Sequence, residues 1–114
     1  MPTQTYNFPD IKFGDTHDGT SFTVLVNAVA LNLTAASIKA QFRANSSTGA
    51  LLKTMVDGVD ITITDAVNGV FQIDPFDIDI PPGVAVYDIE LTLGDGRKKT
   101  YIGGTWCILQ DVTQ

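Results

Sequence analysis

The chain has 114 residues, a formal net charge of −6, and 44% hydrophobic against 18% charged residues. This length and composition indicate one globular domain across residues 1–114, large enough to bury a core, and exclude a disordered chain. The acidic balance excludes general binding to nucleic acid or to an anionic membrane surface, because both require a basic face.

The first half of the chain predicts strands separated by turns. Residues 1–5 are polar, and we expect them to form a flexible arm. Phe22, Val24 and Val26 are spaced two residues apart and predict one apolar strand face. Residues 37–44 predict a second strand, in which four apolar positions alternate with Ser, Lys, Gln and Arg.

The second half continues the same period of two. Short strands are predicted around residues 61–63 and 71–73, and a further one at residues 76–80, where three apolar side chains alternate with Asp77 and Asp79. Residues 87–93 and 102–108 predict the last two strands, and Gly103-Gly104 predicts a β-bulge in the final one.

Turn dipeptides punctuate these strands. Asp18-Gly19, Asp57-Gly58, Asn68-Gly69 and Asp95-Gly96 are all typical of tight turns, and Pro81-Pro82-Gly83 ends one strand before the next. No segment shows a sustained helical period. About seven short strands with regularly spaced turns predict an antiparallel sandwich of two sheets. Tyr87, just after the Pro-Pro-Gly turn, is a candidate tyrosine corner.

The core follows from the same alternation, because a shift of one residue would bury Asp88 and Glu90 instead of their apolar neighbours. The predicted core residues are Phe22, Val24, Ile38, Phe42, Ile61, Phe71, Tyr87, Ile89, Leu91, Ile102 and Trp106.

Arg97, Lys98 and Lys99 form a basic triplet in an acidic chain with only seven Lys and Arg residues. They follow Asp95-Gly96, which we expect to form a type I′ turn between two strands. A phosphate loop needs a helix after its glycines, and here the pattern predicts a strand. The triplet therefore either keeps a hairpin tip soluble or docks a protein partner, and we take it as the candidate docking site.

Other reactive side chains predict little chemistry. His17, the only histidine, lies in a predicted loop where a solvated ring is expected, although a pair with Cys107 remains open. The acidic groups around residues 57–65 and 74–79 lack the spacing of a calcium loop. Trp106 either fills the core or forms a sugar-stacking platform. We expect no catalytic residue, no cofactor and no metal.

Two stretches carry a resemblance to a known family. They are "GVDITITDAVNGVFQI" at residues 58–73 and "PGVAVYDIELTLGDGRKKTYIGGTWCILQDVTQ" at residues 82–114. Both resemble the immunoglobulin-like N-terminal domain of phage baseplate upper proteins and related small tail components. Residues 14–43 resemble that family less closely, in their order of strands and turns. The resemblance implies an immunoglobulin-like antiparallel β-sandwich of about seven to nine short strands.

The resemblance also implies a function. It indicates a non-enzymatic structural domain of a phage or prophage tail or baseplate, which docks onto other virion proteins, or onto copies of itself, through sheet edges and loops. Members of the family continue into further domains, so a chain ending at Gln114 is expected to be a free-standing copy or a small docking subunit.

Location follows from the same reasoning. The residues after Met1 show no signal-peptide pattern, and no apolar run approaches the ~20 residues of a membrane helix. We therefore expect synthesis in the host cytoplasm and a final place in the virion, without membrane contact. The alternative function is a carbohydrate-binding or adhesion module of a bacterial host. A third hypothesis, an enzyme that uses Cys107, has the least support.

Overall fold

The computed structural model describes residues 4–26, 28–46 and 48–110, and it contains strands but no helix among them. No helix long and apolar enough to cross a membrane is therefore found in this described part. The strands are β1 (Gln4–Thr5), β2 (Phe8–Lys12), β3 (Thr16–His17), β4 (Thr20–Thr23), β5 (Leu25–Val26), β6 (Val29–Ala30), β7 (Ser37–Ala44), β8 (Leu51–Val56), β9 (Ile61–Asp65), β10 (Val70–Ile73), β11 (Phe76–Asp77), β12 (Gly83–Thr92) and β13 (Lys98–Leu109).

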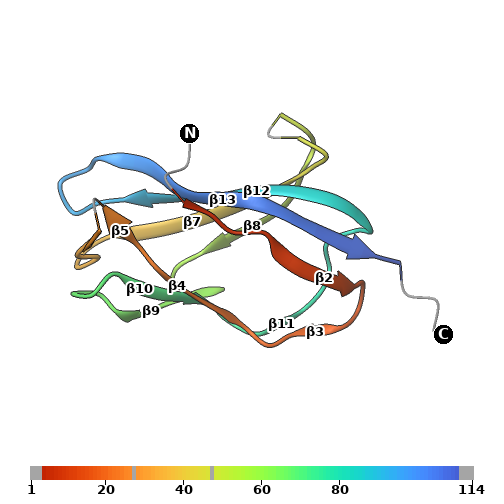
Figure 1. Ribbon diagram of the computed structural model, residues 1–114, viewed down its shortest axis with the longest axis horizontal. Coiled ribbons are helices and arrows are strands. Elements are labelled where there is room, and N and C mark those ends of the chain that lie inside the picture. The colour runs from red at the N-terminus through yellow and green to blue at the C-terminus, as the bar shows by residue number, and fades with distance from the viewer. Residues whose placement is uncertain (1–3, 27, 47, 111–114) are drawn as a thin grey trace.

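The strands form a two-layered sandwich (Figure 1). The larger sheet has the order β1-β13-β12-β7-β8, and β2 also pairs with β13. The smaller sheet has the order β4-β10-β9, with the two-residue pairs β11–β3 and β5–β6 beside it. This order is that of an immunoglobulin-like sandwich. Eight strands have four or more residues, which confirms the predicted number, and the other five have two.

The N-terminal segment differs from the prediction. Gln4 and Thr5 form β1, which pairs in parallel with Ile102 and Gly103 of β13, so they are not a flexible arm. Residues 1–3 lie outside the described part of the chain. β2 continues the same parallel pairing along β13. The larger sheet is therefore mixed rather than purely antiparallel, and pairing between distant segments of this kind leaves no mark on local periodicity.

The core prediction is confirmed. All eleven predicted core residues are buried and belong to one hydrophobic cluster. Trp106 lies at its centre, stacked on Phe8 at 4.1 Å between ring centroids, and its Nε1 donates a hydrogen bond to the Pro9 carbonyl at 3.0 Å. The tryptophan thus packs the core, and its polar atom is satisfied by the N-terminal strand.

Two apolar positions behave differently from the prediction. Val26 is exposed, because the chain turns into the small β5–β6 hairpin immediately after Val24. In residues 76–80 only Phe76 and Asp77 are strand, yet Ile78 and Ile80 are buried. Alternation therefore identified the buried side of that segment although most of it is not paired in a sheet.

The β-bulge lies at Tyr101 and not at Gly103-Gly104. Ile89 pairs with Ile102 and Glu90 with Thr100, which leaves Tyr101 as the extra residue, whereas both glycines pair in regular register. Gly104 has a different role. A Cβ at that position would collide with the carbonyl oxygen of Tyr6, so the missing side chain allows the segment between β1 and β2 to lie against β13.

Tyr87 is not a tyrosine corner. Its hydroxyl donates a hydrogen bond to the carbonyl of Tyr6 at 2.5 Å, far upstream in the chain rather than a few residues away. Burial raises the pKa of Tyr87 well above its usual value, with a smaller contribution from Tyr6. Tyr87 therefore links the segment between β1 and β2 to β12.

The turn between β12 and β13 is not of type I′. Gly96 has φ +91°, as expected, but Asp95 is not among the residues with positive φ. The Gly96 amide donates to the Leu93 carbonyl, and the Leu93 amide donates to the Arg97 carbonyl, both at 2.8 Å. These bonds enclose residues 94–96 as a three-residue loop that ends in a left-handed glycine.

Candidate functional site

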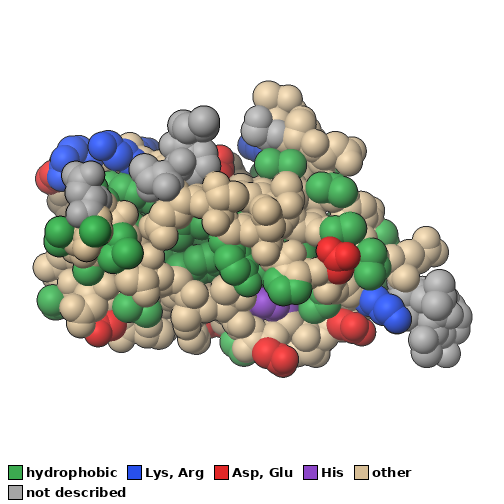
Figure 2. Space-filling model, viewed as in Figure 1, with side chains coloured by type: hydrophobic (Ala, Val, Ile, Leu, Met, Phe, Trp, Pro, Cys, Tyr) green, Lys and Arg blue, Asp and Glu red, His purple; other side chains and the backbone are tan. Residues whose placement is uncertain are grey.

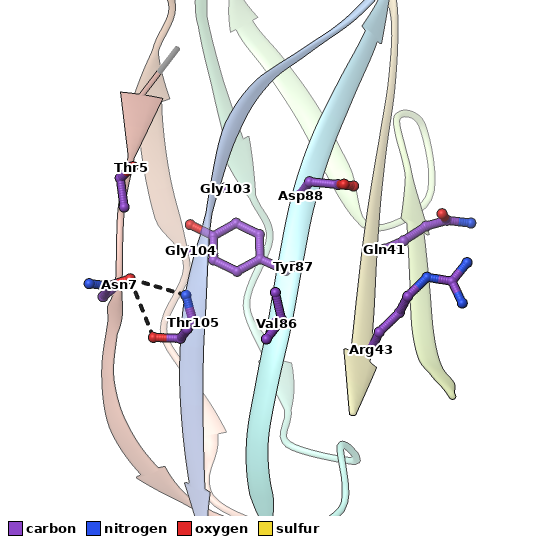
Figure 3. A pocket seen from close by; sticks show the side chains of 10 residues that line it. All are labelled: Thr5, Asn7, Gln41, Arg43, Val86, Tyr87, Asp88, Gly103, Gly104 and Thr105. Carbon is purple, nitrogen blue, oxygen red and sulfur yellow. Dashed lines mark hydrogen bonds between the residues drawn. The ribbon is translucent and has the colours of Figure 1, made fainter. Parts of the chain in front are cut away.

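The outer face of the larger sheet carries a groove of about 380 Å³ (Figure 3). The groove is lined by Thr5 of β1 and Asn7, which lies between β1 and β2, and by three further strands. These are β13 with residues 103–105, β12 with residues 86–88, and β7 with Gln41 and Arg43. In Figure 3 the side chains of Gln41, Arg43 and Asp88 project to the side of the sheet opposite the buried ring of Tyr87.

Register explains the groove. Asp88 lies between Gln41 on β7 and Gly103 on β13, and Val86 lies between Arg43 and Thr105. Because successive side chains of a strand alternate between faces, all of these positions face outward. Gly103 has no side chain, so the surface is hollow beside Asp88.

The groove offers both donors and acceptors. The Asn7 Oδ1 accepts bonds from the backbone amide and hydroxyl of Thr105, at 3.1 and 3.3 Å, which leaves its Nδ2 available. Arg43 donates one bond to the Gly49 carbonyl at 3.2 Å and keeps further donors. Among the described residues nothing bonds the side chains of Gln41 or Asp88. The lining combines these polar groups with apolar surface, as binding sites for small molecules commonly do.

The basic triplet lies at one end of the sandwich. Arg97 is tied to the hairpin turn, because its Nε is 2.8 Å from the Asp95 carboxylate and its backbone amide bonds the same side chain. This contact lowers the pKa of Asp95, mainly through the bond from the Arg97 amide. Lys98 and Lys99 are exposed at the start of β13, opposite Thr92 and Leu91. The three cations follow the hairpin and do not converge on one point.

Exposed apolar side chains share that end. The β5–β6 hairpin presents Leu25, Val26 and Val29, and Val67 projects from the β9–β10 turn. Backbone bonds between Val24 and Gly69 and between Leu33 and Ala66 hold these two turns together. Figure 1 places both turns at the same end as the β12–β13 hairpin, and Figure 2 shows hydrophobic and basic side chains together there. We call this surface the hairpin end.

His17 is not solvated as expected. Its ring makes edge contacts with Phe8, Phe76 and Trp106, and its Nε2 lies 2.9 Å from the Thr20 hydroxyl. Burial lowers the pKa of His17, and the charge of Asp18 opposes this in part.

The structure does not pair His17 with Cys107. His17 contacts Trp106, whose side chain faces the core, whereas Cys107 is the next residue of β13 and faces outward opposite Val84. A nucleophile and its base must lie within hydrogen-bond reach, so this arrangement offers no catalytic pair.

Four of the aspartates make structural contacts. Asp57 accepts a bond from the Ile38 amide at 2.9 Å, Asp65 from the Asn68 side chain at 2.8 Å, and Asp77 from Thr16 at 2.6 Å. Asp79 pairs with Lys53 at 3.2 Å. In the part of the chain that the structure describes, no three His, Cys, Asp or Glu side chains are grouped so that they could hold a metal ion.

The groove was missed by sequence reasoning. Its outward-facing residues had the polar pattern of any solvated strand face, and its first wall is the parallel N-terminal strand that was not predicted. The available signal was Gly103 beside Gly104, which marks a place where a surface is hollow or a strand approaches.

Comparisons of the chain with models of protein families, with curated proteins and with solved structures find no match.

Proposed function

We propose that the chain is a non-enzymatic structural domain of a phage or prophage tail or baseplate, and that it docks onto other virion proteins through its hairpin end. The resemblance of residues 58–73 and 82–114 supports the virion setting. The reactive pair that the sequence left open, Cys107 with His17, is not assembled, because His17 packs against Trp106 on the core side of β13 whereas Cys107 faces outward.

The observation that carries the proposal is the composition of the hairpin end. Val29 is 67% exposed and Val67 is 65% exposed, and the Arg97 to Lys99 triplet lies at the same end of the sandwich. Protein interfaces commonly combine an apolar centre with a polar rim, and clustered exposed apolar residues mark such sites. A basic rim on a chain of net charge −6 suits an acidic partner, whose approach it would accelerate.

Mass spectrometry of purified virions from a phage or induced prophage that carries the gene tests the setting. We expect the chain in the particle together with the tail proteins. Particles with a complete set of tail proteins but without this chain would contradict the proposal.

Docking is tested by incorporation of variants. The double variant Val29→Lys and Val67→Lys should reduce incorporation strongly, because it charges the apolar centre. Val84→Lys, on the outer face of the larger sheet, is the control, since Val84 is also exposed but lies away from the hairpin end. Equal incorporation of both variants would exclude the hairpin end as the docking surface.

The groove favours a second candidate, a carbohydrate-binding or adhesion module. Sugar hydroxyls both donate and accept, which suits the mixed groups of Asn7, Gln41, Arg43 and Asp88. Trp106 is only 1% exposed, so a sugar would bind without stacking on it. Titration with host cell-wall oligosaccharides, followed by NMR, should shift amides of residues 103–105 in the native chain and not in Asp88→Ala. Shifts elsewhere or none would remove this candidate.

A further inference from the structure

Most edges of the sandwich are shielded against pairing with another strand. At the end of β4 the side chain of Gln4 occupies two backbone groups: its Nε2 donates to the Thr23 carbonyl at 3.4 Å, and its Oε1 accepts from the amide of Leu25 in β5 at 3.2 Å. The outer edge of the larger sheet on the same side is β2, which contains Pro9 and so lacks one donor. Both features hinder the addition of a strand on this side of the molecule.

β8 is shielded in another way. Lys53 pairs with Phe42, a core residue, and therefore lies on the inward face of this edge strand. Its Nζ contacts Asp79 at 3.2 Å and lies 5.1 Å from the centre of the Phe76 ring. A lysine that points inward from an edge strand is a recognised obstacle to edge-to-edge pairing, because a second strand would bury its charge.

β9 carries neither a covering side chain nor an inward lysine, and its one irregularity is a β-bulge at Thr64, which leaves Ile61 to Ile63 in regular register with β10. On the other side of β9, within the described residues, only Ile61 meets a partner, Asp57. The first four residues of β9 are all β-branched, with Ile61 and Ile63 alternating with Thr62 and Thr64, and it contains no lysine or proline. Val59, just before β9, is 73% exposed.

Charge indicates what this edge would accept. The chain has no Lys or Arg between Lys53 and Arg97, and none in the strands of the smaller sheet. Asp60 and Asp65 lie at the two ends of β9, and Asp74 bonds the hydroxyl of Thr62 at 2.9 Å. An added strand would therefore run through an acidic field with nothing on this sheet to neutralise it.

We propose that the β9 edge binds an extended, lysine- or arginine-bearing strand of another protein by β-augmentation. The backbone of β9 would supply the hydrogen bonds. Alternate side chains of the added strand would contact Ile63 on the inner side and the aspartates on the outer side.

A second copy of this chain does not fit the edge. Pairing β9 with β9 would bring two acidic edges together. The strands that carry most cations, β7 and β13, are already paired on both sides, and the lysine of β8 is engaged with Asp79. The lysine of the edge strand β2, Lys12, shares that strand with Asp10 and Pro9, so β2 is not a basic strand either. We therefore take the basic strand to come from a different polypeptide. The inference concerns an edge that the hairpin-end proposal does not use, so it stands apart from the phage assignment.

The test uses a short spin-labelled peptide that alternates lysine with valine, and isotope-labelled protein at low salt. The peptide should broaden amide signals of residues 62–64. The same peptide with glutamate in place of lysine should bind at least about tenfold more weakly. Ile63→Lys, which gives β9 the inward charge that β8 has, should abolish binding.

Because Ile63→Lys could itself unfold the chain, two pairs of charge variants provide a second test. Asp60→Asn with Asp65→Asn should weaken peptide binding several-fold. Asp10→Asn with Asp88→Asn removes the same number of charges from the larger sheet and should leave peptide binding unchanged. The proposal fails if the lysine peptide does not bind at about 1 mM. It also fails if the glutamate peptide binds equally well, or if broadening centres on β8 or on the hairpin end.

Discussion

Tyr87 joins the N-terminal strand to the centre of the larger sheet. Its ring is stacked on Phe42 at 5.3 Å between centroids, while its hydroxyl satisfies the Tyr6 carbonyl. Nearby, Trp106 satisfies the Pro9 carbonyl in the same way. Two core aromatic residues thus use their polar atoms to hold a strand whose parallel pairing is short.

Leu91 tests the assignment of the buried face. It is fully buried on β12, opposite Ile38 of β7. Leu91→Ala should lower the free energy of unfolding by about 2–4 kcal/mol, because it removes apolar contacts and leaves a cavity. A denaturant titration measures this loss. A value below about 1 kcal/mol would mean that the site collapses or is less buried than the structure indicates.

His17 predicts a pH dependence of stability. Burial lowers its pKa in the folded state below the ordinary value of about 6.5. The stability contributed by the neutral ring is therefore complete above that ordinary value and is lost as pH falls through the folded-state pKa. Most carboxylates titrate below about pH 5, and the chain has no other histidine, so the range from pH 7 to 5 reports on His17.

Thermal unfolding across that range measures the effect. The melting temperature of the native chain should fall as the pH is lowered. His17→Gln keeps a polar partner for Thr20 but cannot gain the proton, so its curve should be flatter. Parallel curves for the two proteins would contradict the prediction.

At the scale of elements, the hairpin between β12 and β13 depends on one backbone conformation. Gly96 has φ +91°, and a Cβ there would meet no atom within 4 Å, so strain rather than collision decides the effect of a substitution. Gly96→Val should destabilise the fold by about 1 kcal/mol or more, because a β-branched residue disfavours positive φ.

A matched variant separates conformation from bulk. Gly96→Asn should lose clearly less stability, since asparagine tolerates the left-handed region better than other non-glycine residues. Chemical denaturation of the two variants compares them. Equal losses would show that positive φ at this position is not what the turn requires.

The local sequence pattern predicted which segments form strands better than it predicted which strands pair with each other. Alternation identified the buried faces of β7, β10 and β12, because one face of each strand packs while the other is solvated. It could not reveal that β1 and β2 pair in parallel with β13, since long-range pairing is decided by the whole fold. The groove, the partner of Tyr87 and the role of Gly104 all depend on that pairing, so they were missed too.

At the scale of the whole molecule, charge is divided between the two layers. All seven Lys and Arg residues belong to strands of the larger sheet or to its β12–β13 hairpin. The strands of the smaller sheet carry none, and the loops around it carry aspartates such as Asp15, Asp18 and Asp60. The two layers therefore differ in the electrostatic field that each presents to its surroundings.

The basic triplet is expected to contribute neither to the stability of the fold nor to DNA binding. Changing Arg97, Lys98 and Lys99 to glutamine should leave the fold intact, because exposed charges contribute about 0–1 kcal/mol each. The native chain should not retain DNA more tightly than roughly micromolar at low salt, since three cations along a hairpin on a chain of net charge −6 cannot neutralise several phosphates. Circular dichroism and a DNA-binding titration measure the two expectations. Tight, salt-sensitive binding of DNA that disappears in the triple variant would make the hairpin end a nucleic-acid site and overturn its assignment to protein docking.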